Sequence, residues 1–254
     1  MLLHVKNIKS RIVPHIKNTS NTPLYATLLL LTLMYMGAVS FAMNVIGGDA
    51  RVILSLYTTT AIQISALFLA GFITFRIFYI LLIKRSARPV SAIATDLRST
   101  VFSARRLFQA IPIIILFPLF FSTFTSFKDK IPEFVPFRYD PIFMTWDRFL
   151  HGGHQPWEIL QPVLGFAIVT FIIASVYKLW FLTKFCVLYW QAFSLSHPDI
   201  RARFFIATLL CWIINGSLLA VLFSSAGPCY FGDLFPDSFN PYQELMNYLY
   251  SVNE

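Results

Sequence analysis

The chain alternates between long apolar runs and short polar segments. Five of the runs are long enough for a helix to cross a bilayer, which takes about 20 residues. They cover approximately residues 23–46, 52–83, 107–127, 159–183 and 204–224. Because a helix satisfies all of its backbone polar groups within one segment in lipid, the pattern predicts an all-α, polytopic membrane helical bundle with five transmembrane helices.

One polar-rich stretch, residues 140–157, lies between the third and fourth apolar runs. Asp140 followed by Pro141 is a helix-start signal, in which the aspartate can cap the helix, and the pair Gly152 and Gly153 is a stop signal. The helix that these signals predict has about three turns, which is too short to span a bilayer.

The predicted short helix has two different faces. Its aromatic and aliphatic residues recur at helical spacing, while Asp147 and His151 lie four residues apart on another face. Such a pattern is typical of a helix at the membrane surface, with the aromatic face in the headgroup region. We therefore expect an interfacial helix within the 128–158 loop. The alternative is a simple connector between two spans.

Composition supports an integral membrane protein. Hydrophobic residues make up 57% of the chain, charged residues 13%, and the mean hydropathy is +0.65, whereas about a quarter of the residues of soluble proteins are charged. We expect a single membrane domain, residues 23–254, after a basic N-terminal segment, residues 1–22. The three cysteines lack metal-ligand spacing, so no zinc site or disulfide framework is implied.

The net charge of +8 could indicate nucleic-acid binding, but the basic residues gather between particular spans. Thirteen Lys and Arg lie in the N-terminal segment, in residues 84–106 and near the start of the fifth run. The remaining connecting segments contain five, namely Arg51 and four in residues 128–158. The positive-inside rule then places the N-terminus in the cytoplasm, and residues 128–158 and the C-terminus outside, in a cell (inner) membrane. The expected partners are membrane lipids and not nucleic acids, and the sequence assigns no oligomeric state.

Four basic residues near the ends of spans bear on this topology. The thirteen include Lys184, Arg201 and Arg203, taken as residues of the loop before the fifth span. Arg76 lies inside the second run but close to its basic end. We expect its side chain to reach the interface and to anchor the helix there.

Two polar segments share the predicted outer face. The first is residues 140–157, and the second begins with Ser-Ser-Ala-Gly-Pro-Cys-Tyr at residues 224–230. The first contains an Asp-x-x-Leu-His-Gly-Gly element that ends in Pro-Trp, formed by Asp147, Leu150, His151, Gly152, Gly153, Pro156 and Trp157. Followed by a span and a Ser-x-Gly-Pro-x-Tyr, this order resembles the bacterial branch of the type 2 phosphatidic acid phosphatase superfamily, which is related to inositolphosphorylceramide synthases. The resemblance covers roughly residues 105–250.

The resemblance implies a six-helix membrane protein that cleaves or transfers phosphate groups on lipids, with a phosphorylated histidine and a second histidine activated by an aspartate. The family carries these histidines in Pro-Ser-x-His and Arg-x(5)-His-x(3)-Asp elements, and this chain has neither. The family's phosphate-binding element, a lysine seven residues before Arg-Pro, is not matched by Lys84 and Arg88-Pro89, whose spacing and predicted face differ. We expect a truncated or catalytically incomplete member, and no catalytic residue is assigned.

The candidates for contact with a substrate headgroup are the polar residues of the two segments, namely Asp147, His151, His154 and Tyr230. Two histidines beside acidic residues could form an acid–base pair or bind a metal. A metal site needs three or four convergent ligands, so we assign neither a metal nor a cofactor. The alternative for the histidines is a purely structural turn.

Two functions remain open. The first is a lipid phosphatase or phosphotransferase acting on membrane lipid phosphates at the extracytoplasmic face. The second is a non-enzymatic membrane scaffold or regulatory subunit. A small transporter is disfavoured, because the spans show no internal repeat and almost no charge that would mark a pathway.

Overall fold

The computed structural model describes residues 22–47 and 51–253, and every regular element within them is helical. Within these residues, five segments are long and apolar enough to cross a membrane, namely Pro23–Ile46, Thr58–Lys84, Ala104–Phe134, Ala167–Phe193 and Pro198–Leu222. The predicted all-α membrane helical bundle with five spans is therefore confirmed. The expected cytoplasmic segment 1–22 lies outside the described residues except for Thr22.

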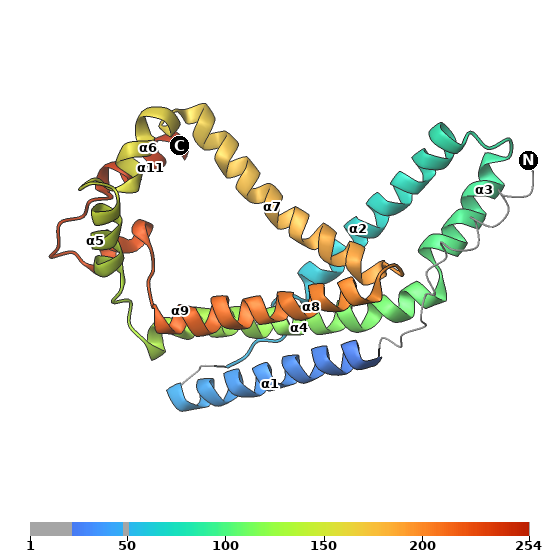
Figure 1. Ribbon diagram of the computed structural model, residues 1–254, viewed down its shortest axis with the longest axis horizontal. Coiled ribbons are helices and arrows are strands. Elements are labelled where there is room, and N and C mark those ends of the chain that lie inside the picture. Colours follow the sequence, from blue (N-terminus) through green and yellow to red (C-terminus); the bar gives the residue numbers. More distant parts are fainter. Residues whose placement is uncertain (1–21, 48–50, 254) are drawn as a thin grey trace, which may run out of the picture.

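The five spans differ in how they pack. They are α1 (Thr22–Ile46), α2 (Thr58–Phe78) with η1 (Tyr79–Lys84), α4 (Ala104–Phe134), α7 (Ala167–Phe193), and α8 (Pro198–Ile213) with η3 (Ile214–Leu218) and α9 (Leu219–Leu222). The shorter elements are α3 (Pro89–Asp96), η2 (Leu97–Val101), α5 (Asp140–Leu150), α6 (Pro156–Leu164), η4 (Pro228–Tyr230), α10 (Phe231–Leu234) and α11 (Gln243–Asn253). Figure 1 shows α1, α4 and α8 side by side, whereas α2 and α7 diverge from them.

The second span begins at Thr58, later than expected, because the chain before it packs on α4 without forming a helix. The backbone N–H groups of Ile53 and Tyr57 donate to the hydroxyls of Ser126 and Ser122, each over 3.0 Å. These side chains provide acceptors for backbone donors that a helix would otherwise satisfy.

The expected fourth span, residues 159–183, is divided between α6 and α7. The break follows Pro162 and lies at Gly165, whose N–H donates to the carbonyl of Gln161 over 2.8 Å. A Cβ at position 165 would lie 2.5 Å from that carbonyl oxygen, so only glycine fits. The helix α7 continues to Phe193, so Lys184, which the topology count placed in a connecting segment, lies inside this helix.

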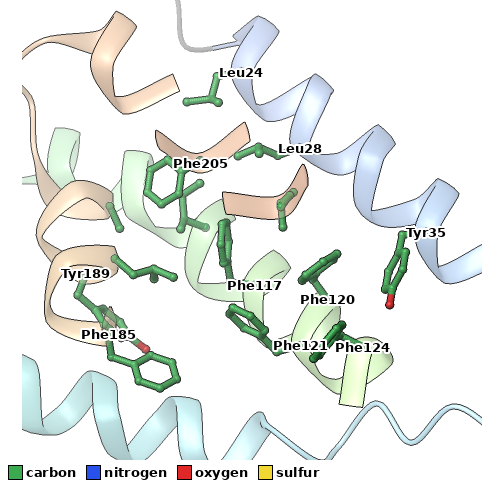
Figure 2. Packing of buried hydrophobic residues seen from close by; sticks show 14 of the residues in the cluster. Leu24, Leu28, Tyr35, Phe117, Phe120, Phe121, Phe124, Phe185, Tyr189 and Phe205 are labelled. Atoms are coloured by element: carbon green, nitrogen blue, oxygen red, sulfur yellow. The ribbon is translucent and has the colours of Figure 1, made fainter. Parts of the chain in front are cut away.

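Aromatic side chains form the centre of the bundle, as Figure 2 shows. Phe117 and Phe120 of α4 are buried, and Phe205 of α8 packs edge-on against Phe117 with ring centroids 5.4 Å apart. In the apolar 18-residue stretch of α4, half of the residues are buried, whereas 12% are buried in the corresponding stretch of α7. The core is therefore built around α4, and α7 turns most of its surface away from it.

Arg201 was expected in a loop but is buried within the bundle, with 1% of its surface exposed. Its guanidinium donates to the carbonyls of Gln191 (3.0 Å), Ala192 (3.1 Å) and Gln109 (2.7 Å) and to the hydroxyl of Tyr25 (3.1 Å). No Asp or Glu of the described residues forms an ion pair with it. Its counter-charge is the negative end of the α7 dipole, where the last carbonyls have no partner within the helix.

Arg76 is held by an ion pair, a contact that the expectation of an interfacial anchor did not include. Its Nε and Nη2 atoms both donate to the carboxylate of Asp96 on α3, with 2.8 Å between Nε and Oδ2. The hydrogen bond from Arg76 is the main cause that lowers the pKa of the Asp96 carboxyl below its ordinary value, although desolvation opposes it. The pair fixes the end of α2 against the basic segment that follows.

The Asp96 pair predicts a pH-dependent stability. Because the pKa of Asp96 is lower in the folded state than in the unfolded state, its contribution is present above the ordinary carboxyl pKa, about 4, and is lost as the pH falls through the lowered folded value. We expect the stability difference between the wild type and Asp96→Asn to be largest near neutral pH and to shrink in acid. Thermal unfolding of the detergent-solubilised proteins measures it, and a difference independent of pH would contradict the assignment.

Candidate functional site

The helix α5 begins and ends where the sequence signals placed it. It covers Asp140–Leu150, has Pro141 in its first turn and is followed by Gly152 and Gly153, whose φ angles are +66° and +94°. Glycine adopts such angles without steric cost, so the pair ends the helix and turns the chain toward α6. The predicted start and stop are confirmed.

The sequence suggested that the carboxylate of Asp140 caps its own helix, but in the structure it does not. It is buried, with 4% of the residue exposed, and no side-chain cap is present at the start of α5. Its oxygens accept hydrogen bonds from the Ser225 hydroxyl (2.7 Å) and from the backbone N–H groups of Ala226 (3.1 Å) and Gly227 (2.7 Å). Asp140 thus joins the two polar segments, which lie far apart in the sequence.

Backbone contacts strengthen this junction. The N–H groups of Arg138 and Tyr139 donate to the carbonyl of Ser224 over 3.3 and 3.2 Å, and the Ser224 hydroxyl donates to the carbonyl of Val135 over 2.9 Å. Gly227 has a φ of +91° and a ψ of 174°, a combination that is essentially restricted to glycine. The Gly-Pro turn of the tail is therefore shaped to present its N–H groups to α5.

A hollow of about 360 Å³ lies between α5 and the tail. Its polar lining includes the carboxylates of Asp140 and Asp147 and the side chain of Tyr242. Burial, followed by the negative charges of Asp147 and Asp140, raises the pKa of the Tyr242 hydroxyl above its ordinary value. The remaining lining residues are mostly apolar, namely Phe143, Met144, Trp146, Leu150, Ser225, Gly227, Pro228 and Phe231.

Hydrogen bonds of Gln155 and Tyr242 connect α5, the start of α6 and the tail. Gln155 is 1% exposed, and its side-chain amide donates to the Met144 carbonyl and accepts from the Tyr242 hydroxyl, each over 3.4 Å. The indole N–H of Trp157 donates to the carbonyl of Pro241 over 3.1 Å. The start of α6 and the tail are thereby fastened to the same side of α5, which Figure 1 shows beside α6 and α11.

The structure brings only one of the four sequence-predicted residues into the hollow. Asp147 lines it, is half-buried, and its carboxylate makes no hydrogen bond with the described residues. His151 is exposed and donates from Nδ1 to the carbonyl of Asp147 over 2.7 Å. His154 is exposed, with its Nδ1 3.2 Å from Glu158 Oε2, and Tyr230 is exposed outside the lining. The two histidines therefore contact their own loop.

Sequence reasoning missed the residues that build the hollow. Asp140 was assigned to a local cap, and neither Gln155 nor Tyr242 was named as a site residue. No local pattern assigns the Gln155 side chain to this region. The Asn-Pro-Tyr at residues 240–242, a polar turn followed by an aromatic residue between α10 and α11, was a visible signal of a turn that could carry a site residue. Among the described residues, no group of three or more His, Cys, Asp or Glu side chains could hold a metal ion.

Comparison with known proteins adds no assignment to this site. No protein-family model, no curated protein and no solved structure matches the chain.

Proposed function

We propose that this membrane protein binds the headgroup of a membrane lipid in the hollow between α5 and the tail. The observation that carries the proposal is the set of three hydrogen bonds to Asp140, which brings Ser225, Ala226 and Gly227 to the side of α5 that holds Asp147. The exposed apolar residues Phe149 and Leu150 suit a helix that lies at the membrane surface. A lipid headgroup would then be at the same depth as the hollow.

The polar groups of the hollow favour a headgroup with hydrogen-bond donors. Asp147 offers an unused acceptor, and the Tyr242 hydroxyl, which donates to Gln155, can still accept. None of the described residues that line the hollow is Lys or Arg. The hollow therefore suits the hydroxyl or ammonium groups of a headgroup, and a phosphate attached to that headgroup would lie outside it, away from the carboxylates.

The resemblance to the type 2 phosphatidic acid phosphatase superfamily supports a membrane lipid as the ligand. On this proposal the chain supplies the headgroup-binding part of a phosphatase or phosphotransferase, and residues outside this sequence supply the histidine chemistry. The purified 254-residue chain is then expected to release no phosphate from phosphatidic acid or isoprenyl diphosphate, and release by this chain would contradict the proposal.

The proposed orientation places the hollow on the extracytoplasmic side of a cell (inner) membrane and the N-terminus in the cytoplasm. The support is the excess of Lys and Arg in residues 1–22 and 84–106. Lys184, Arg201 and Arg203 all lie within helices, and without these three basic residues the excess is still ten against five. Labelling of a tag at Glu254 by a membrane-impermeant reagent in intact cells tests the orientation.

The headgroup proposal predicts a preference for phosphatidylethanolamine over phosphatidylcholine, because both are zwitterionic and only the former carries N–H donors. Replacing Asp147 by Asn removes a charge-assisted hydrogen bond and should reduce this preference by about tenfold. Native mass spectrometry of the protein with equal amounts of the two lipids measures the ratio.

The matched control for this experiment is Asp233→Asn. Asp233 is exposed in the same tail and does not line the hollow, so this variant should keep the wild-type ratio. Equal binding of the two lipids to the wild type, or an equal loss in both variants, would show that the hollow does not select the headgroup.

A non-enzymatic scaffold or regulatory subunit is the second candidate function. The observation that favours it is the low burial of α7, because 12% of the residues in its apolar 18-residue stretch are buried within the described structure. This surface could face either lipid or a partner helix, and the phosphate-release assay of a co-purified complex separates the two functions. Phosphate release by the complex that is unchanged in Asp147→Asn would support the scaffold, whereas release that falls in this variant would support headgroup binding by this chain.

A further inference from the structure

A second cavity lies at the other end of α7, away from the hollow. It has a volume of about 240 Å³ and lies where α7 meets α2, next to η2 and the first turn of α4. Figure 1 shows α2 and α7 approaching each other near the end of α7, and the rings of Phe72 and Trp190 meet edge-on there with centroids 6.5 Å apart. Five of the residues in its wall are aromatic, namely Phe68, Phe72, Phe75, Trp190 and Phe193.

Two arginines line the same cavity, and their hydrogen bonds differ. Arg76 is committed to the carboxylate of Asp96 through two donors. Arg106 is half-buried and, within the described chain, makes one hydrogen bond, from Nη1 to the carbonyl of Phe193 over 2.9 Å. A guanidinium has five N–H donors, so most of those on Arg106 remain for a ligand. The hydroxyls of Ser194 and Thr100 also line the cavity.

The charge around the cavity is strongly positive. Residues 84–106 contain six Lys and Arg and the single acid Asp96, which Arg76 already neutralises. Basic segments directly beside a transmembrane helix attract anionic lipids, and basic pockets between such helices bind their headgroups. An anionic group is therefore the complementary ligand for this end of the molecule.

We propose that this cavity binds an anionic phospholipid, with its phosphate at Arg106 and an acyl chain against the aromatic wall. The aromatic wall decides between a lipid and a soluble anion, because rings such as Phe72 and Trp190 offer nothing to a hydrated phosphate but bury an alkyl chain favourably. The wall continues along α2, where only 6% of the residues in the apolar 18-residue stretch are buried. An acyl chain in the cavity can therefore extend into the bilayer.

Fluorescence of Trp190 reports occupancy, because a bromine atom on a lipid chain quenches an indole that it touches. The protein is reconstituted with brominated phosphatidylglycerol or brominated phosphatidylcholine, and subtracting the signal of Trp190→Phe isolates this residue from the other tryptophans. We expect phosphatidylglycerol to quench Trp190 at lower mole fractions than phosphatidylcholine. Equal quenching by the two lipids would overturn the proposal.

The matched variants are Arg106→Gln and Arg105→Gln, which remove the same charge from adjacent residues. Arg105 is exposed and does not line the cavity. We expect Arg106→Gln to weaken the apparent affinity for phosphatidylglycerol about fivefold and Arg105→Gln to leave it nearly unchanged. An equal loss in both variants would mean that general surface charge attracts the lipid, and the assignment to the cavity would be wrong.

A third variant separates lipid binding from the structural contact between Arg106 and α7. Leu69→Phe keeps every charge and every hydrogen bond and narrows the cavity that Leu69 lines. It should reduce the phosphatidylglycerol-specific quenching, and unchanged quenching would place the lipid elsewhere. Displacement of the brominated lipid by millimolar inorganic phosphate would identify a phosphate site instead. Asp147→Asn should leave these results unaltered, so this proposal and the headgroup proposal fail independently.

Discussion

Replacing Arg201 by methionine is expected to lower the free energy of unfolding by about 3–5 kcal/mol, because each hydrogen bond from a charged donor contributes about 1.5–3 kcal/mol and the contributions are not additive. Methionine fills most of the space and has no donor. Arg201 connects α1, α4 and α7 to α8 through Tyr25, Gln109, Gln191 and Ala192, so the substitution removes contacts among four of the five spans at once.

The loss is not shared equally among the acceptors. The Gln109 carbonyl also receives the Tyr25 hydroxyl over 3.0 Å, and the Gln191 carbonyl also receives the N–H of Ser194 over 3.3 Å. The hydrogen bond that Ala192 accepts in the described chain comes from Arg201. Its carbonyl is therefore left buried without a partner, which is the most expensive single consequence of the substitution.

Arg203→Met is the matched control for this experiment. Arg203 lies two residues further along α8 and is exposed, so its loss should change the unfolding free energy by no more than about 0.5 kcal/mol. Arg201→Lys should give an intermediate loss, because one ammonium group cannot reach acceptors on three helices in place of a planar guanidinium. Denaturant unfolding in detergent measures all three variants, and equal stability of Arg201→Met and Arg203→Met would refute the assigned role.

Arg201 also illustrates where sequence reasoning stops. The number of spans followed from the length of the apolar runs, since the bilayer thickness sets that length. In the sequence Arg201 and Arg203 are equivalent basic residues before a span, and the positive-inside rule treats them alike. Their difference arises from packing, because the end of α7 meets α8 at one residue and not at the other. No local pattern contains that information.

In the candidate site, too, the local features were predictable from the sequence and the long-range contacts were not. The start and stop of α5 followed from Asp-Pro and Gly-Gly, because these residues determine backbone geometry locally. Asp147 was found because polar residues on an apolar helix are conspicuous. The partners of Asp140 are 85 or more residues away in the chain, and a carboxylate before a proline is explained equally well as a cap. Long-range hydrogen bonds of this kind are visible only in the structure.

Replacing Asp140 by alanine is expected to cost about 3 kcal/mol and to detach the tail from α5. Two backbone N–H groups would lose their acceptors, which are Oδ2 for Ala226 and Oδ1 for Gly227, and each partly buried donor left unsatisfied costs about 1–3 kcal/mol. Asp140→Asn keeps one acceptor oxygen but turns an NH₂ group toward a donor, so its loss should be smaller and still measurable.

The readout that distinguishes a junction from general destabilisation is limited proteolysis. With Asp140 replaced by alanine, cleavage between residues 225 and 242 should accelerate more than cleavage in the loop between α3 and α4, because only the former depends on the carboxylate. Asp237→Ala, which removes an exposed acid from the same tail, is the control and should leave both rates unchanged. Loss of the phosphatidylethanolamine preference should accompany release of this part of the tail, since Ser225 and Gly227, which Asp140 holds, line the hollow. If Asp140→Ala and Asp237→Ala are cleaved at equal rates, the two polar segments are not joined through Asp140.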